Sequence, residues 1–506
     1  MNTSLKQHAA LSVTRRQFVK RCSAATAVMG FPMVVPATVF GANDKIRVAV
    51  IGLGGRGVKS HVTGLGNQNG VEVVAICDPD RERLNSAAAN IRQWYDRDVD
   101  TYIDMRDIMK RADIDVVSIA NQTYWHGLST IWACQAGKHV YVEKPLSQYI
   151  WEGRQMVNAA RKHNCIVQCG TQHRSSSGIR EAIQWTREGH LGKIRQITCF
   201  AIKPRGPIGK RDTPLPIPDS IDYDLWCGPA QKLPIYRNVL QYDCRYMWNT
   251  GVGESVDQGV HELDVARWWL GEKALPKRTM SIGGRFMWDD VGQVANAHIM
   301  YYDFPTAPVV HEIYNITAPA FVDGLNIFKT KGSRAEKTLR AGPVGLRVMY
   351  EEGCVLVQAY LPHQTCVAYD LNGKEIRSFH GHGEPHHFDN FIAAVRSGRR
   401  DDLHAEIEQG HLSTATAHTA NISYRVGEVA SVKQQRAVTA GVPDFQESLD
   451  RFYMVLKGHG INPDTATHGP WLEVDHPKEC FKNHDRANEL VRGSYRESFK
   501  VPDLSI

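Results

Sequence analysis

Short apolar runs alternate with segments of helical periodicity in the first third of the chain. Runs rich in β-branched residues occur at 46–51, 71–78, 115–121, 139–145 and 165–172. Helical stretches separate them, for example HGLSTIWACQAGK. Regular alternation of strands and helices is typical of a parallel, doubly wound sheet with helices on both faces. We therefore expect such a sheet in the N-terminal part of the chain.

A different pattern follows in the second part of the chain. The stretch GESVDQGVHELDVARWWLG places Asp257, His261, Asp264 and Trp268 at helical spacing on one face of a single helix. Three later runs, VANAHIMYYDF, VVHEIYNI and GCVLVQAYL, alternate like sheet strands. They predict an open, largely antiparallel sheet with the helix on one face, which makes this part an α+β domain.

The length of 506 residues suggests two or three domains. We predict an export signal at 1–42, a nucleotide-binding domain at 43–165, a substrate and oligomerisation domain at 166–430 and a C-terminal extension at 431–506. The fold class is therefore α/β, with a doubly wound parallel sheet followed by an α+β domain.

The N-terminal segment carries most of the excess charge. The formal net charge is +6, and residues 1–43 hold five basic residues and no acid, so the remainder is near +1. This near-neutral remainder argues against a nucleic-acid surface. The pair Arg15–Arg16 precedes a modestly apolar stretch interrupted by prolines, as in a bacterial twin-arginine signal. We expect an exported, periplasmic protein with no stable membrane span after processing; an uncleaved membrane tether is the alternative.

A glycine-rich turn follows the first predicted strand. VIGLGGRG places Gly52, Gly54 and Gly57 in the G-x-G-x-x-G spacing that lets a diphosphate approach the backbone and a helix pack on the strand. Asp78 ends the second strand, where an acid accepts the ribose hydroxyls and repels a 2′-phosphate. We therefore predict NAD as the cofactor, with NADP less favoured; Arg81 and Arg83 lie close enough to moderate that preference.

Two further positions carry candidate chemistry. Lys144, braced by Pro145, lies at the carboxyl end of a predicted strand, where ligands of such sheets bind; a plain salt bridge to Glu143 is the structural alternative. Asp257, four residues before His261, can fix the tautomer of that histidine and raise its basicity. A purely structural pair remains open. We predict no metal site, because a third ligand at suitable spacing is missing.

Residues 200–250 are rich in proline, arginine and aromatic residues and show no regular period, which is typical of a binding loop. The loop contains the aromatic residues Tyr223, Trp226, Tyr236, Tyr246 and Trp248. Aromatic faces beside Arg205 and Arg245 suit a sugar ring, which has polar edges and apolar C–H surfaces. The same side chains can instead pack the loop itself.

Together, VIGLGGRG, AICDPD, GKHVYVEKP and DQGVHELDVARWWLG resemble the Gfo/Idh/MocA family over residues 45–430. The resemblance implies a Rossmann domain, a C-terminal α/β domain that often forms oligomer contacts, and nicotinamide-dependent oxidation or reduction of sugars, inositols and related polyols. It makes Lys144, Asp257 and His261 the catalytic positions, with Tyr242 and Tyr246 as outside candidates. One departure is Asn121, where members of the family commonly have a proline.

In addition to the three catalytic candidates, we predict two groups of site residues. The cofactor contacts are Gly52, Gly54, Gly57, Asp78, Asn121, His126, Glu143 and Lys144. The substrate contacts are Arg174, Tyr246, Trp248, Asp257 and His261. The predicted partners are a carbohydrate or polyol substrate and a second copy of the chain.

Export raises a problem for a nicotinamide enzyme, because no NAD pool exists outside the cytoplasm to recycle the cofactor. We therefore expect NAD to be bound before export and retained. The cycle then closes either through a second substrate that reoxidises the cofactor, or through transient oxidation, elimination and hydride return, as in NAD-dependent glycoside hydrolases. A non-catalytic sugar-binding protein is a third possibility, but it predicts loss of Lys144 or His261, and both are present.

Overall fold

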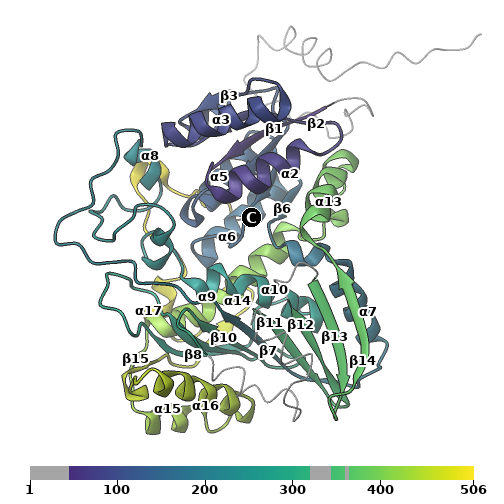
Figure 1. The fold of residues 1–506 in the computed structure, drawn as a ribbon, viewed down its shortest axis with the longest axis vertical. Helices are drawn as coiled ribbons and strands as arrows, with labels where there is room; N and C mark the ends of the chain where they lie inside the picture. Colours follow the sequence, from purple (N-terminus) through teal and green to yellow (C-terminus); the bar gives the residue numbers. More distant parts are fainter. Residues whose placement is uncertain (1–44, 319–343, 359–363, 506) are drawn as a thin grey trace, which may run out of the picture.

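The computed structural model describes residues 45–318, 344–358 and 364–505. The predicted export signal at 1–42 lies outside these residues. Two sheets dominate the structure: one belongs to the N-terminal domain and the other, larger sheet to the C-terminal domain, with helices between and around them (Figure 1). The ten cysteines of the described part are free, and all except Cys480 are buried.

The N-terminal domain is a parallel six-stranded sheet. Its strands, in sheet order, are β3 (Asp100–Tyr102), β2 (Val71–Cys77), β1 (Ile46–Ile51), β4 (Val116–Ile119), β5 (His139–Val142) and β6 (Val167–Cys169). All neighbouring pairs are parallel, which confirms the doubly wound Rossmann prediction. The order reverses between β1 and β4, and ligands of such sheets bind at that switch point.

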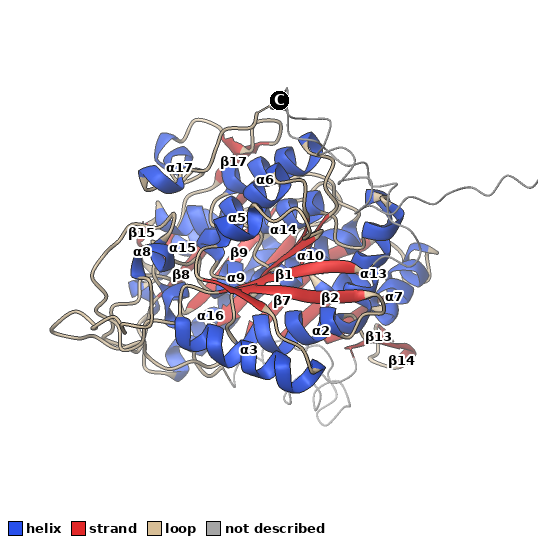
Figure 2. Ribbon diagram, turned by 90° about the horizontal axis from the view of Figure 1, so that it is seen from above, coloured by secondary structure: helices blue, strands red, loops and turns tan. Residues whose placement is uncertain are grey.

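Helices cover both faces of this sheet (Figure 2). They are α2 (Thr63–Gly66), α3 (Arg81–Tyr95), α4 (Met105–Met109), α5 (Thr123–Gln135) and α6 (Ile150–Lys162), with a π-helical turn η2 (Gly57–Val62) before α2. The observed strands end earlier than predicted. Residues 120–121 and 143–145 leave the sheet at its carboxyl edge, where they are free to face a ligand.

The N-terminal domain also recruits segments from far along the chain. Strand β6 pairs with β5, so the sheet continues past residue 165, where the sequence placed the domain boundary. Helix α13 (Glu384–Ser397) packs Phe388 and Phe391 against the strand residues Val48 and Val50. Phe499, near the C-terminus, joins the core on the opposite side. Segments from far along the chain therefore complete the core of this domain.

The C-terminal domain is built on a twelve-stranded mixed sheet. Its strands, in order, are β14 (Glu375–Gly381), β13 (Gln364–Asp370), β12 (Gly353–Gln358), β11 (Val344–Tyr350), β7 (Ile194–Ile202), β10 (Val309–Tyr314), β9 (Ala297–Tyr302), β8 (Arg278–Gly284), β16 (Thr467–His468) and β15 (Glu428–Val429), with β17 (Leu472–Asp475) and β18 (Cys480–Phe481) beside β8. Within this sheet β7 and β10 are parallel and the other described pairs are antiparallel. The predicted open, largely antiparallel sheet is confirmed.

Helices cover the two faces of the larger sheet. One face meets α7 (Ser177–Arg187), α10 (Gly259–Leu270) and α14 (Ile407–Arg425), whose apolar residues share a core with Ile197 and Met300. The other face meets α16 (Pro443–Gly458), which follows α15 (Val432–Thr439) and packs Phe445 and Phe452 against strand residues such as Met280. The predicted single helix is divided into α9 (Glu254–Asp257) and α10, which begins after Gln258.

Shorter helical segments complete the described part. They are η3 (Gln172–Ser175), α8 (Tyr223–Cys227), η4 (Asp243–Tyr246), η5 (Arg400–Asp402), η6 (Pro463–Thr465), α17 (Asp485–Glu489) and η7 (Glu497–Phe499). None of the helices in residues 45–318, 344–358 and 364–505 combines the length and apolarity that crossing a bilayer requires.

Candidate active site

The glycine turn after β1 forms one wall of a cavity of about 370 Å³. Gly52 has φ +88°, and a Cβ there would lie 2.4 Å from the backbone nitrogen of Asn121. A Cβ on Gly57 would lie 1.8 Å from the carbonyl oxygen of Gly52, so this glycine lets the helix contact the strand. A Cβ on Gly55 would meet open space. The turn therefore has the tight backbone and the open side that a diphosphate requires.

Asp78 lines the same cavity at the end of β2. Its carboxylate accepts hydrogen bonds from the backbone N–H groups of Leu53 (2.7 Å) and Asp80 (3.0 Å). Burial raises the pKa of Asp78, although these two donors oppose the rise. Arg83 also lines the cavity, and its Nε lies 3.5 Å from a carboxylate oxygen of Asp80. Asp78 is thus placed to receive ribose hydroxyls, with the nearby arginine held by another acid.

A second cavity of about 700 Å³ continues from the first. Six residues line both: Arg56, Ala120, Asn121, Gln122, Tyr242 and Cys244. Oδ1 of Asn121 is buried and has no hydrogen-bond partner among the described residues. These features fit an extended dinucleotide. Its adenosine half would lie in the smaller cavity, beside Gly55 and Asp78, and its nicotinamide half in the larger cavity, beyond Oδ1 of Asn121.

His126 lies in the first turn of helix α5, at the wall of the larger cavity. Its ring nitrogens lie 2.8 Å from the carbonyl oxygen of Pro145 and 3.1 Å from that of Asn121. Burial lowers the pKa of this histidine. His126 therefore ties together the two backbone turns that carry Asn121 and Lys144, which are both predicted cofactor contacts.

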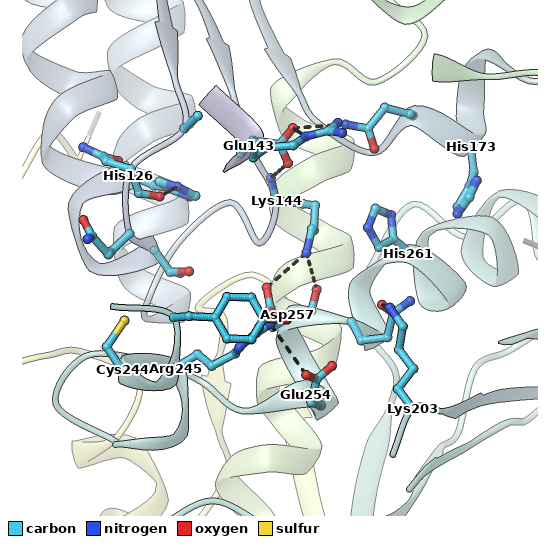
Figure 3. Close-up of a pocket in the computed structure, with 18 of the residues that line it drawn as sticks. His126, Glu143, Lys144, His173, Lys203, Cys244, Arg245, Glu254, Asp257 and His261 are labelled. Carbon is cyan, nitrogen blue, oxygen red and sulfur yellow. Dashed lines mark hydrogen bonds and ion pairs between the residues drawn. The ribbon is translucent and has the colours of Figure 1, made fainter. Parts of the chain in front are cut away.

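Lys144 projects from the first domain into the larger cavity (Figure 3). Its Nζ donates to the carbonyl oxygen of Asp257 at 2.9 Å and to Oδ1 of the same residue at 3.0 Å. Arg245 donates to the other oxygen, Oδ2, at 2.7 Å. Burial opposes ionisation of Asp257, but the charges of Lys144 and Arg245 hold its pKa well below the ordinary range.

His261 faces the same cavity from helix α10, beside Lys144 (Figure 3). Burial, followed by the positive charge of Lys144, lowers the pKa of His261 well below the ordinary value. The imidazole is therefore neutral at physiological pH and can accept a proton. The sequence predicted Asp257 as the group that orients His261; both oxygens of Asp257 instead accept hydrogen bonds from cations, so this acid positions the lysine.

The carboxylate of Glu143 binds residues other than the Lys144 ammonium group, which was its expected partner in the structural alternative. Its Oε1 accepts hydrogen bonds from Arg56 (2.8 Å) and Gln172 (3.2 Å), and it lies 3.2 Å from Nε2 of His61. Burial opposes its ionisation, but Arg56 and His61 hold its pKa well below the ordinary range. The side chain of Lys144 is thereby left to face the other domain.

Three predicted substrate contacts do not line the larger cavity. Arg174 is buried in an ion pair with Asp264, 2.7 Å away. Tyr246 is buried and donates its hydroxyl to Glu254 at 3.1 Å. Trp248 lies beneath the guanidinium of Arg425. Their residue types suited a sugar, but long-range partners hold them elsewhere.

The loop aromatics follow the packing alternative. Trp226 is buried and stacks on Tyr223, in a cluster with other loop residues. Two aromatic residues of the loop depart from this: Tyr236 is 41% exposed and lines neither cavity, whereas Tyr242 is 60% exposed and lines both, with the guanidinium of Arg245 3.6 Å from its ring centre. Of the two outside candidates for a catalytic tyrosine, only Tyr242 thus reaches the cavities.

Several cavity residues were not predicted as site residues. They come from separate segments: Arg56, Gln172, His173, Lys203, Glu254, Gln258, His382 and Glu384. Arg56 lies inside the glycine motif and Gln258 inside the helix motif, so their positions offered a signal. His382 and Glu384 lie more than 200 residues from the nucleotide motif, and no local pattern marks them. In the described part of the chain, no group of three His, Cys, Asp or Glu side chains is placed to hold a metal ion.

Comparison with known protein families agrees with this geometry. A family described as "Oxidoreductase family, NAD-binding Rossmann fold" matches residues 46–171, and its "C-terminal alpha/beta domain" partner matches residues 191–325. Together the matches span just over half of the chain. The chain belongs to the Gfo/Idh/MocA family. Its first domain is therefore an NAD-binding Rossmann domain, as the glycine turn and Asp78 indicated.

Individual relatives cover parts of the chain. A D-glucoside 3-dehydrogenase of Escherichia coli is 30% identical over 233 residues, 46% of this chain and 56% of that protein. A glycosyl hydrolase family 109 protein of a Shewanella strain is 35% identical over 130 residues, 24% of this chain and 28% of that protein. The chain thus matches about a quarter to just over half of the length of these curated relatives.

Solved structures share the fold. The WlbA dehydrogenase of Bordetella pertussis, in complex with NADH and UDP-GlcNAcA, superposes with a TM-score of 0.54 at 18% identity, covering 76% of this chain and 97% of that one. The putative oxidoreductase yvaA of Bacillus subtilis gives a TM-score of 0.53 at 14% identity, covering 75% and 97%. At these identities the likeness concerns the fold alone.

Proposed function

We propose that this protein oxidises a CH–OH group of a sugar, glycoside or cyclic polyol with NAD. The observation that carries the proposal is the convergence of two side chains on one cavity. Lys144 comes from the nucleotide-binding domain and His261 from the other domain, and both line the larger cavity, which continues into the nucleotide cleft. The likeness to a D-glucoside 3-dehydrogenase supports a carbohydrate as the substrate.

The two side chains have complementary roles in this reaction. His261, neutral because of burial and the nearby lysine, accepts the proton of the substrate hydroxyl. Lys144, fixed by Asp257, donates a hydrogen bond to the same oxygen and stabilises its alkoxide character. When bound, NAD supplies the hydride acceptor at nicotinamide C4. Enclosure by both domains strengthens these electrostatic contacts because it limits access of water.

The protein is proposed to be exported through a twin-arginine signal and to act in the periplasm with retained NAD. Support comes from the Arg15–Arg16 pair in the sequence and from the long loop 203–253, whose residues Gln241, Tyr242 and Cys244 line the nucleotide cavity. Purified protein should keep NAD through dialysis, detectable by absorbance after denaturation. Loss of all NAD on dialysis, with weak rebinding, contradicts retention.

A redox-neutral glycoside hydrolase is the second candidate. The similarity to glycosyl hydrolase family 109 proteins over 130 residues favours it. In that scheme His261 would take the proton of a substrate hydroxyl while NAD, when bound, supplies the acceptor for a hydride from the same carbon, so that a ketone forms. The ketone would acidify the neighbouring C–H, and loss of that proton would expel the glycosidic oxygen as the aglycone alcohol. Water would then add to the double bond, and the hydride would return to the ketone carbon. The same residues serve the first step of both reactions, so the geometry of this step does not separate them.

The assay that distinguishes the two uses NAD-loaded protein without added cofactor. Ketone formation in stoichiometric amount with a reduced acceptor supports the oxidoreductase. Release of the aryl group from aryl glycosides, with no net change at 340 nm, supports the hydrolase. Absence of both products across a broad panel of sugars and polyols contradicts the proposed function.

We also propose a homo-oligomer that forms through the large C-terminal sheet. The sheet is extensive, with twelve strands in the described part, and its edge strand β14 carries exposed residues. Light scattering of the purified protein tests this proposal. A strictly monomeric mass over the micromolar range contradicts it.

A further inference from the structure

The wall of the larger cavity that belongs to the second domain carries more positive than negative charge. Arg205 lies 3.2 Å from Glu254, and Arg245 lies 3.6 Å from the same carboxylate. Arg245 also lies 2.7 Å from Asp257, which in turn pairs with Lys144 at 3.0 Å. The carboxylates of Glu254 and Asp257 are therefore shared among three cations, of which Lys144 comes from the first domain. One further lysine of the second-domain wall remains.

That remaining lysine is Lys203, which directly follows strand β7 and lines the cavity. Its Nζ donates to Oε1 of Gln258 at 2.5 Å, and Nε2 of Gln258 donates to Oε1 of Glu262 at 2.8 Å. Glu262 is buried behind the cavity wall, and burial raises its pKa to about 8. Its carboxyl group therefore carries less negative charge than an exposed glutamate, and burial also lowers the pKa of Lys203, whose ammonium group the charges of Glu254 and Glu262 stabilise. The wall thus holds three cations of the second domain, Lys203, Arg205 and Arg245, against two carboxylates, and Lys144 of the first domain lies beside it.

The opposite side of the cavity does not share this excess. Arg56 forms ion pairs with both Glu143, at 2.8 Å, and Glu384. On the nucleotide side Arg56 and Lys144 are matched in number by Glu143 and Glu384, so the positive excess lies on the second-domain wall. Neither Lys203 nor Arg205 lines the smaller cavity that the glycine turn borders, so the diphosphate of a dinucleotide held at that turn would not lie against them.

We propose that the second-domain wall binds an anionic substituent of the carbohydrate substrate, and that Lys203 and Arg205 determine this specificity. The ligand chemistry is a carboxylate or a phosphate attached to the sugar ring. The planar guanidinium of Arg205 can bind either anion through two parallel hydrogen bonds, and Lys203 adds a point charge beside it. This inference rests on the proposed function and names the substrate class of the same site.

The test is binding of matched sugar pairs to the full-length, NAD-loaded protein, measured by calorimetry. Each neutral methyl glycoside (gluco, galacto and N-acetylgluco) is compared with its C6-carboxylate and its 6-phosphate. The variants are Lys203→Met and Arg205→Gln, with the charge-keeping Arg205→Lys beside them. Lys210→Met is the matched control, because Lys210 is exposed, lies outside the cavity and pairs with Asp289.

We expect one anionic member to bind at least about tenfold tighter than its neutral partner, as for a charge-assisted hydrogen bond. Lys203→Met and Arg205→Gln should each remove about tenfold of that preference. Arg205→Lys, which keeps the charge but not the two parallel hydrogen bonds, should keep only part of it, and Lys210→Met all of it. Equal or tighter binding of every neutral partner, a preference that survives both neutral substitutions, or no binding of any anionic sugar overturns the inference. Anion binding without turnover contradicts the proposed function alone, and turnover of neutral sugars only contradicts this inference alone.

Discussion

The ammonium group of Lys144 lies 3.0 Å from Oδ1 of Asp257, and the two residues belong to different domains. This contact joins the domains at the cavity and fixes where the lysine points. Burial and, after it, the charge of Lys144 lower the pKa of the His261 imidazole. A lysine held in place and a histidine held neutral are the two groups that alcohol oxidation needs.

Replacing either member of the proposed catalytic pair, Lys144 or His261, should abolish most of the activity. Lys144→Met removes the cation that stabilises the alkoxide, and His261→Asn removes the base. Each should lower kcat by a factor on the order of 10² or more, measured as product formed by NAD-loaded protein. His190→Asn is the control, since His190 is exposed and lies outside both cavities. If both replacements leave kcat within threefold of the unmodified protein, the assignment of these roles fails.

Asp78 should control the choice of cofactor. Asp78→Ala removes a buried anion placed to accept ribose hydroxyls, so the affinity for NAD should fall about 10- to 100-fold. The affinity for NADP should stay the same or rise, because the repulsion of its 2′-phosphate is gone. Fluorescence titration of both cofactors measures the ratio. The neighbouring exposed Arg81→Met should leave the NAD affinity nearly unchanged; an unchanged NAD-to-NADP ratio in Asp78→Ala would count against the nucleotide assignment.

The parts of the site that the sequence predicted are those encoded by short-range patterns. The glycine turn, Asp78 and Lys144 each follow a strand of the first sheet, and strand ends of a parallel sheet meet at one edge. His261 and Asp257 were recognised from one helical motif. Their roles were harder to predict. The sequence suggested His261 as the partner of Asp257, whereas in the structure Lys144 and Arg245 each donate to one of its carboxylate oxygens.

Residues whose positions depend on distant segments were missed or misplaced. Lys203 reaches the cavity because strand β7 packs against helix α10 and ends beside Gln258, and Glu384 reaches it because α13 returns to the first domain. Arg174 carried the right chemistry for a sugar contact but is neutralised by Asp264 from α10. Pairing between distant segments is not visible in periodicity or composition, which explains both kinds of error.

Arg174 should matter for stability and not for substrate binding. Arg174→Met leaves Asp264 buried without its cation, which should lower the free energy of unfolding by about 3–5 kcal/mol. The KM of the folded variant should remain within about twofold of the original value, because Arg174 does not line the cavity. Denaturant titration and steady-state kinetics measure the two quantities. A large rise in KM with unchanged stability would restore the substrate-contact interpretation.

The larger sheet should make the protein sensitive to acid through two buried histidines. Burial lowers the pKa of His298 to about 3, and burial together with His298 lowers that of His311 to about 3. Between pH 6.5 and 3 the unfolded chain binds protons at these positions and the native state does not, so stability falls as pH falls. Each histidine should cost about 2 kcal/mol at pH 5 relative to pH 7.5.

The His298→Leu variant isolates this effect. Its own packing change is the same at both pH values, so the difference in unfolding free energy between pH 7.5 and pH 5 should shrink by about 2 kcal/mol. Urea titration at the two pH values measures it. A pH difference identical to that of the unmodified protein means that His298 is protonated to the same extent in both states.

The most direct test of the account is an experimental structure of the full chain with NAD bound. We predict that the nicotinamide ring enters the larger cavity, with C4 facing a space that Nζ of Lys144 and a ring nitrogen of His261 both border, close enough for a substrate carbon to sit about 3–3.5 Å from C4. A nicotinamide ring outside this cavity, or Lys144 and His261 facing separate spaces in the complex, would contradict the claim that the two domains build one catalytic centre.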